Sequence, residues 1–113
     1  MKHKTIVKNF KFKELKLNSM SKILCLKLYK FMQRLRICEE ELEKEYHPND
    51  EMRCPVHLSI GQEGPAVAIS MQLNASDKML STHRSHAHYL AKGGNLTMMI
   101  SEFFGRETGC SGG

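Results

Sequence analysis

The sequence predicts an α/β fold that is rich in helices, with one short strand and a parallel sheet that this chain leaves incomplete. Apolar residues recur at spacings of three and four between residues 24 and 42, which is the pattern of one helix face. Capping residues and glycines delimit three further helices, whereas only residues 78–82 are predicted as a strand. Because one strand cannot form a sheet, we expect further strands beyond residue 113.

Length and composition are compatible with one small domain. The chain has 113 residues, 7% aromatic residues and no tryptophan, and its mean hydropathy is -0.42, which predicts a lean hydrophobic core. No stretch approaches 18 uninterrupted apolar residues, so no membrane span is expected. We assign residues 1–20 to a basic, loosely ordered extension and residues 21–113 to the domain.

Positive charge is concentrated at the start of the chain. The net charge is +5, and residues 1–36 carry eleven Lys and Arg against one acidic residue, Glu14. A basic arm can bind nucleic acid or anionic lipid, although such arms are more often solvated tails or docking segments. An alternative function is therefore a small basic helical module that binds nucleic acid or a protein partner. Charge alone supports that alternative, and we do not expect nucleic acid as the partner.

Cysteine spacing and the start of the chain indicate a reducing compartment. The first residues lack the apolar core and cleavage site of a secretory signal, and they are rich in Lys rather than the Arg of transit peptides. No two cysteines lie within four residues of each other, so no zinc knuckle is predicted. We expect free thiols at all four positions, namely Cys25, Cys38, Cys54 and Cys110.

The first helix is predicted from residue 24 to just before Pro48, because the residue preceding a proline is excluded from helical geometry. Its apolar face comprises Leu24, Leu28, Phe31, Leu35, Cys38 and Leu42. Glutamates crowd its last turns, where they oppose the helix dipole, so we expect this end to fray. Residues 49–58 are predicted as a loop.

A second helix is predicted to begin at a capping box and to run to about residue 73. Ser59 and Gln62 have the spacing of that box. Pro65 leaves two possibilities, because proline inside a helix deletes a hydrogen bond but is tolerated in the first turn. Either the helix kinks at Pro65, or it begins so that Pro65 falls in its first turn. Residues 74–77 are predicted as a turn.

Two short helices are predicted after the strand of residues 78–82. Ser85 can cap a helix over residues 86–92, which the pair Gly93-Gly94 ends. Asn95 can cap a last helix over residues 96–104, and Gly105 ends it. The remaining residues are predicted as loop. Their glycine content suits an anion-binding loop, but the phrase lacks the Gly-Lys-Ser/Thr ending of a P-loop.

Arg84 is a candidate phosphate ligand because of its position. It follows the predicted strand and precedes a predicted helix, and ligands of open α/β sheets bind in the crevice at that edge. A helix N-terminus there offers free N–H groups, and arginine adds a fixed fork of donors. A solvated surface arginine is the alternative interpretation.

Four histidines accompany Arg84. His83, His86 and His88 alternate along the chain, but residues two apart on a helix do not share a face, so no metal site is predicted from them. His57 precedes the second predicted helix, and a lone histidine is more often a structural residue than a catalyst.

Three sequence motifs, called phrases below, resemble those of a known protein family. They are His57-Leu58-Ser59-Ile60-Gly61-Gln62-Glu63, His83-Arg84-Ser85-His86-Ala87-His88, and the stretch from Phe104-Gly105-Arg106 to Gly113. In order and spacing they resemble the start of the alpha subunit of thiamine-diphosphate-dependent 2-oxo acid dehydrogenases, the pyruvate and acetoin dehydrogenase group. The resemblance covers roughly residues 24–113 and implies the N-terminal part of a thiamine-diphosphate-binding domain, truncated where the family's glycine-rich loop would continue.

The resemblance implies roles for the candidate residues. The pair His83-Arg84 matches the position that contacts the cofactor diphosphate, and His57 matches the histidine beside the 2-oxo acid. His86 and His88 match a histidine-rich phrase near the thiamine, so they are second candidates for catalysis by hydrogen bonding or proton transfer. Pro65 departs from the family, which more often has another small residue there.

The resemblance also implies a cofactor and partners. Thiamine diphosphate would be the cofactor, with magnesium held by a Gly-Asp-Gly phrase and a downstream asparagine that this chain lacks. The full-length relative would oxidatively decarboxylate a pyruvate-like 2-oxo acid, or cleave acetoin, and pass the acyl group to a lipoyl-bearing acyltransferase. It would work with a beta subunit as a heterotetramer, in the cytoplasm or the mitochondrial matrix. We expect the 113-residue chain alone to be inactive.

Overall fold

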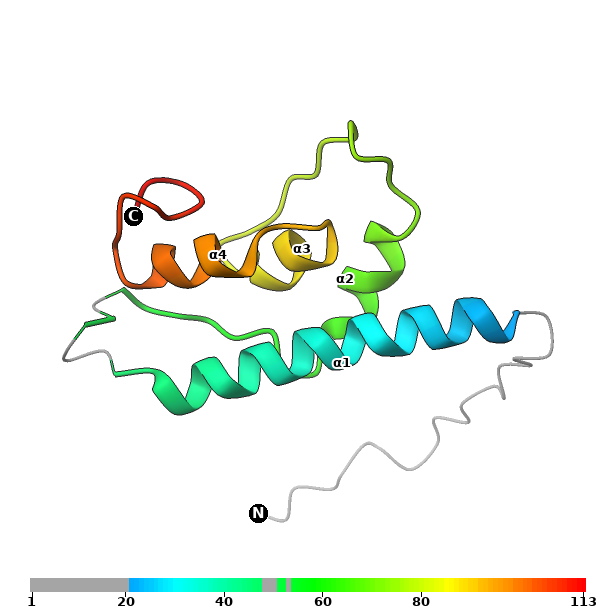
Figure 1. The fold of residues 1–113 in the computed structure, drawn as a ribbon, viewed down its shortest axis with the longest axis horizontal. Coiled ribbons are helices and arrows are strands. Elements are labelled where there is room, and N and C mark those ends of the chain that lie inside the picture. Colours follow the sequence, from blue (N-terminus) through cyan, green and yellow to red (C-terminus); the bar gives the residue numbers. More distant parts are fainter. Residues whose placement is uncertain (1–20, 48–50, 53) are drawn as a thin grey trace, which may run out of the picture.

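The computed structural model describes residues 21–47, 51–52 and 54–113. Within these ranges the chain forms four helices, α1 (Lys22–Glu45), α2 (Glu63–Ser70), α3 (His86–Ala91) and α4 (Leu96–Phe103). Figure 1 shows α1 as one long rod, with the three shorter helices gathered along one side of it. The basic extension predicted for residues 1–20 lies outside the described residues.

Helix α1 confirms the predicted apolar face. The side-chain oxygen of Ser21 accepts a hydrogen bond from the backbone N–H of Leu24 at 3.2 Å and caps the first turn. Leu35 and Leu42 are buried, and the other four predicted face residues are half-buried. The helix ends at Glu45, ahead of Pro48. Its length gives the smaller helices one continuous surface to pack against.

Helix α2 corrects the predicted capping box. The helix begins at Glu63, and Gln62 is its N-cap without a side-chain capping bond. Ser59 is instead part of a turn, in which the backbone N–H of Gln62 donates to the Ser59 carbonyl at 2.8 Å and Gly61 adopts a φ of +87°. That left-handed backbone cannot belong to a helix. Pro65 consequently falls in the first turn of the helix, so the helix does not need to kink there. The helix ends at Ser70 rather than at residue 73.

The predicted strand is wrong. Residues 78–82 form no strand, and no strand occurs elsewhere in the described ranges. A strand is defined by hydrogen bonds to a neighbouring backbone, and the described part of the chain offers this segment no such neighbour. Leu80, the middle residue of this segment, is 99% exposed. The prediction of a helix-rich structure is therefore confirmed, whereas the parallel sheet is not observed.

Turn and capping signals after α2 are mostly confirmed. The turn of residues 74–77 is closed by the Asp77 N–H donating to the Asn74 carbonyl at 3.1 Å. Asn95 caps α4, since its Oδ1 accepts from the backbone N–H of Met98 at 3.0 Å. Ser85 occupies the N-cap of α3 as predicted, but its hydroxyl makes no capping hydrogen bond.

Glycines end both short helices where predicted. Gly93 after α3 has a φ of +93°, and Gly105 after α4 has a φ of +60°. Only glycine adopts this left-handed backbone without strain, which explains why these positions stop the helices. The segment after Gly105 contains no helix or strand, in agreement with the predicted loop.

The hydrophobic core lies between α1 and the other helices. Helix α2 contacts both α1 and α3, and α1 also contacts α3. Val67 of α2 is fully buried and Leu35 of α1 is 1% exposed. The remaining core residues are Leu42, Met52, Ala66, Ala87, Leu90, Ala91, Met99 and Phe103. Three of these ten core residues are alanines, and only one is aromatic, in keeping with the lean core expected from composition.

The substitution Leu35→Ala should lower the free energy of unfolding by about 2–5 kcal/mol, because it removes a fully enclosed side chain and leaves a cavity. Urea titration followed by circular dichroism measures this change. Leu26→Ala is the matched control, since Leu26 lies on the same helix and is 49% exposed. Its effect should stay within about 0.5 kcal/mol. Equal losses for both variants would contradict the assigned core.

Candidate functional site

Two of the predicted site residues, far apart in the sequence, come together in the structure. The rings of His57 and His83 lie with their centroids 4.8 Å apart and their planes at 70°. His57 lies ahead of α2 and His83 ahead of α3, and both side chains are exposed. The fold thus joins the first two sequence phrases at one place on the surface.

Arg84 follows His83 directly in the chain and has a hydrogen-bond donor that lacks an acceptor within the described ranges. Its side chain is half-buried, and its Nε atom is buried without a hydrogen-bond partner among the described residues. A buried charged donor without a partner destabilises a protein by about 1–3 kcal/mol or more, so an anionic ligand here would offset that loss. The strand expected ahead of Arg84 is not formed. The Arg84 side chain, and not the edge of a sheet, is therefore the evidence for a site here.

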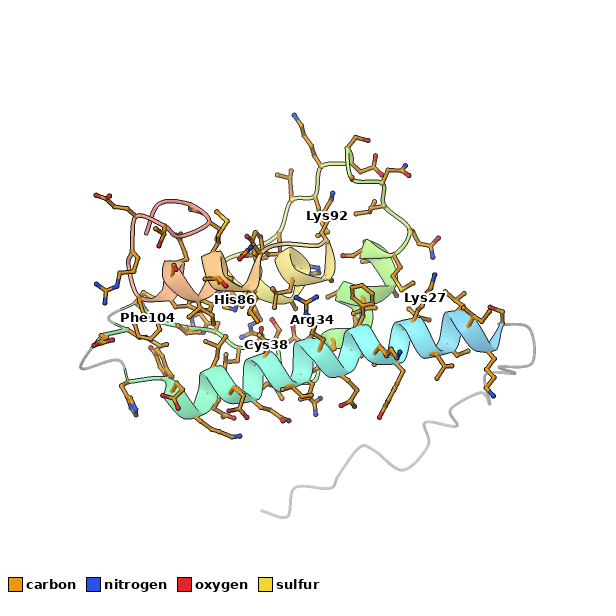
Figure 2. The ribbon with its side chains drawn as sticks, viewed as in Figure 1. Lys27, Arg34, Cys38, His86, Lys92 and Phe104 are labelled. Atoms are coloured by element: carbon orange, nitrogen blue, oxygen red, sulfur yellow. The ribbon has the colours of Figure 1, made fainter. Side chains whose placement is uncertain are left out.

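His86 lies in the interior, between α1 and the layer of α3 and α4 (Figure 2). Its side chain is 12% exposed, and its Nδ1 lies 3.8 Å from Oε1 of Glu39. Its ring meets Phe103 edge to face, with centroids 4.7 Å apart and planes at 86°. His86 is therefore held by a carboxylate on one side and an aromatic ring on another.

Glu39 is a residue that the sequence analysis missed. It is only 1% exposed, and its Oε2 accepts a hydrogen bond of 2.7 Å from the backbone N–H of Ser59. The sequence held a usable signal, because Glu39 is four residues after Leu35 and three before Leu42, on the buried face of α1. An acidic residue at such a position is buried, and buried carboxylates require partners.

His88 is separated from His86 by one residue of α3. Its Nδ1 is buried and has no hydrogen-bond partner in the described ranges. Both histidines line a cavity of about 920 Å³ beside α3, to which Ser85 and Cys110 also contribute. Within the described part of the chain, no three His, Cys, Asp or Glu side chains converge closely enough to hold a metal ion.

An ion pair fixes the segment that carries His57. Arg36 of α1 donates from Nε to Oε1 of Glu63 at 2.7 Å and from Nη2 to Oε2 at 3.3 Å. The same Oε1 accepts from the backbone N–H of Gly61 at 2.9 Å. The hydrogen bond from Arg36 lowers the pKa of Glu63 despite burial of that carboxyl, and it raises the pKa of Arg36. This two-pronged contact ties the start of α2 to α1.

A second cavity, which has the form of a groove, lies away from the histidines. This groove, of about 710 Å³, runs along α1 and α4 and is lined largely by apolar side chains such as Ile37, Leu96 and Phe104. It contains none of the predicted site residues. We therefore place the candidate site at the histidines and Arg84, where unpaired polar atoms and the clustered rings occur.

Known proteins similar to this chain point to one family. The family model described as "Dehydrogenase E1 component" matches residues 30–113. The alpha subunit of acetoin:2,6-dichlorophenolindophenol oxidoreductase from Cupriavidus necator is 38% identical over 88 residues, covering 77% of this chain and 26% of the relative. The subunit of the same name from Bacillus subtilis is 47% identical over 58 residues, covering 50% of this chain and 17% of the relative.

A plant relative has a pyruvate dehydrogenase name. The mitochondrial pyruvate dehydrogenase E1 component subunit alpha-1 of Oryza sativa subsp. japonica is 37% identical over 82 residues, covering 73% of this chain and 20% of the relative. The chain thus spans about a quarter or less of the length of these relatives. No solved structure matched the chain significantly. Within the described ranges, no helix combines the length and apolar character needed to cross a bilayer.

The lowered pKa of Glu63 makes stability depend on pH. A carboxyl whose folded pKa is depressed contributes stability above its unfolded pKa, about 4.3 for glutamate, and that contribution is lost as pH falls through the folded pKa. Below about pH 4.3, the urea concentration at the unfolding midpoint should decrease with falling pH more steeply for the wild-type chain than for Glu63→Gln. The exposed Glu107→Gln should keep the wild-type slope. Parallel curves for wild type and Glu63→Gln would contradict the assigned ion pair.

Proposed function

The chain belongs to the dehydrogenase E1 component family, and on that premise we propose that it forms the first part of the alpha subunit of an enzyme that oxidises a pyruvate-like 2-oxo acid or acetoin. The family match from residue 30 to residue 113 is the observation that carries the proposal. The printed names of the relatives support these two substrates, since they are acetoin oxidoreductase and pyruvate dehydrogenase alpha subunits. Transfer of the acyl group to a lipoyl-bearing acyltransferase is part of the same proposal.

We propose Arg84, assisted by His83, as the part of this chain that would hold the diphosphate of thiamine diphosphate. The buried Nε of Arg84 has no partner in the described part of the chain, so the residues present fit an anionic group. When bound, thiamine diphosphate supplies the electron sink for decarboxylation, while protein side chains orient the reactants. The metal-holding Gly-Asp-Gly phrase of the family does not occur in this chain, so magnesium would be held elsewhere.

The histidines are proposed to act on the substrate side. His57 is exposed and in ring contact with His83, which supports a place for it beside the reacting molecule. An exposed imidazole can serve as a proton donor or acceptor for a bound molecule. His86 and His88 lie deeper, along a shared cavity, where they would orient the reacting groups by hydrogen bonds.

A beta subunit is the proposed partner. Several exposed apolar side chains lie outside the core of the described ranges, including Ile23, Leu26, Tyr29 and Ile37 of α1. Large exposed apolar areas are typical of surfaces that another chain or segment covers. The heterotetramer and the cytoplasmic or matrix location stay predictions.

Arg84→Ala should weaken thiamine diphosphate binding roughly ten- to hundred-fold in a complete alpha subunit produced with its beta partner. The substitution removes a charge-assisted hydrogen bond of about 1.5–3 kcal/mol, and about 1.4 kcal/mol corresponds to tenfold. The activity is titrated with cofactor to obtain the constant. Arg106→Ala is the control, because Arg106 is exposed and carries the same charge. An unchanged constant for Arg84→Ala would show that the diphosphate lies elsewhere.

His57→Ala should lower the turnover number more than the cofactor affinity, since its proposed place faces the substrate and not the diphosphate. The same titration, run at saturating substrate, separates the two quantities. His47→Ala, which removes another exposed imidazole, is the control. If His57→Ala raises the cofactor constant and leaves turnover intact, the two roles have been assigned the wrong way round.

A further inference from the structure

We propose that Glu39 is a positioning residue that holds His86 in one tautomer, with the proton on Nδ1 and the lone pair on Nε2. This inference rests on the proposed function only in giving His86 a place near the chemistry. The geometry that carries it, a buried carboxylate facing the buried Nδ1 of a partly exposed imidazole, is independent of any cofactor.

Both facing atoms are unsatisfied. Oε1 of Glu39 and Nδ1 of His86 are each buried without a hydrogen-bond partner in the described part of the chain, and they lie 3.8 Å apart. Two such atoms, left unpaired, would together destabilise the fold by several times RT. A bridging water requires about 4.5 Å between its two partners, given hydrogen bonds near 2.8 Å and a tetrahedral angle. The gap is too short for a water, so a direct hydrogen bond between these two atoms is the proposed arrangement.

Charge sets the direction of that hydrogen bond. A carboxylate only accepts, so in the proposed arrangement Nδ1 of His86 donates. A neutral imidazole that carries its proton on Nδ1 presents Nε2 as an acceptor. His86 would then face the cavity lined by Ser85 and His88 with a basic nitrogen, which is the state that can take a proton from a bound molecule.

The same carboxylate is itself fixed on its other oxygen. Oε2 of Glu39 accepts from the backbone N–H of Ser59 at 2.7 Å, two residues after His57. Phe103 meets the imidazole edge to face and restricts the rotation of its ring. Glu39 thereby links the His57 segment to His86, and the backbone N–H of Ser59 orients its carboxylate.

No other carboxylate among the described residues is within ion-pair distance of His86. The remaining ionisable groups along its cavity are Asp77, Lys78, His88, Tyr89, Lys92, Glu102 and Cys110. Arg84 precedes His86 by two residues in the chain. Glu39 is therefore the group whose removal should change the tautomer.

The test uses the complete chain with ¹⁵N-labelled histidine, measured at alkaline pH, where imidazoles are neutral. Long-range ¹H–¹⁵N correlation spectra distinguish the two tautomers of each ring. In the wild type, His86 should carry its proton on Nδ1. In Glu39→Gln, the introduced amide can still accept from Ser59 through its oxygen, and its NH₂ group then faces Nδ1 as a donor. His86 should switch to the tautomer with the proton on Nε2.

Glu43→Gln is the matched control, because Glu43 lies on the same helix, is exposed, and loses the same charge. It should leave His86 in the wild-type tautomer. The proposal is overturned if wild-type His86 shows the mixture of a free imidazole, or if Glu39→Gln keeps the wild-type pattern. Neither outcome depends on cofactor or substrate. A subunit that lacks 2-oxo acid activity but shows the switch would overturn the proposed function and leave the role of Glu39 standing.

Discussion

The arrangement depends most on one buried acidic side chain, that of Glu39 on the inner face of α1. A carboxylate that is 1% exposed is strongly destabilising unless donors surround it. The backbone N–H of Ser59 is one such donor, and the imidazole of His86 faces the other oxygen. Two segments of the chain, which carry two of the family motifs, thus meet this side chain at the same point on α1.

The ion pair of Arg36 and Glu63 reinforces the same junction from the neighbouring turn of α1. Glu63 is the first residue of α2, so its two hydrogen bonds to Arg36 fix where that helix starts and how it leaves α1. A bidentate contact also specifies direction, which a simple apolar contact would not. Together, Glu39 and Arg36 make α1 a template on which the His57 segment, α2 and α3 are aligned.

The candidate site holds further unpaired polar atoms beside those of Glu39 and His86. Arg84 Nε and His88 Nδ1 are buried without partners in the described ranges, and the His57 and His83 rings meet at the surface. Unpaired buried polar atoms are rare in folded proteins and concentrate where ligands bind or chemistry occurs. The chain spans about a quarter or less of the length of these relatives.

The sequence by itself determined the features that depend on near neighbours in the chain. The apolar face of α1, the Asn95 cap, the turn at residues 74–77 and the glycine stops follow from contacts three or four residues apart. The motifs shared with the family were also identified from the sequence alone. Tertiary structure decided the late start of α2, the missing strand, the burial of Glu39 and the meeting of His57 with His83. These features depend on residues brought together by packing, because a strand requires a neighbouring backbone and a buried carboxylate requires donors that local spacing does not specify.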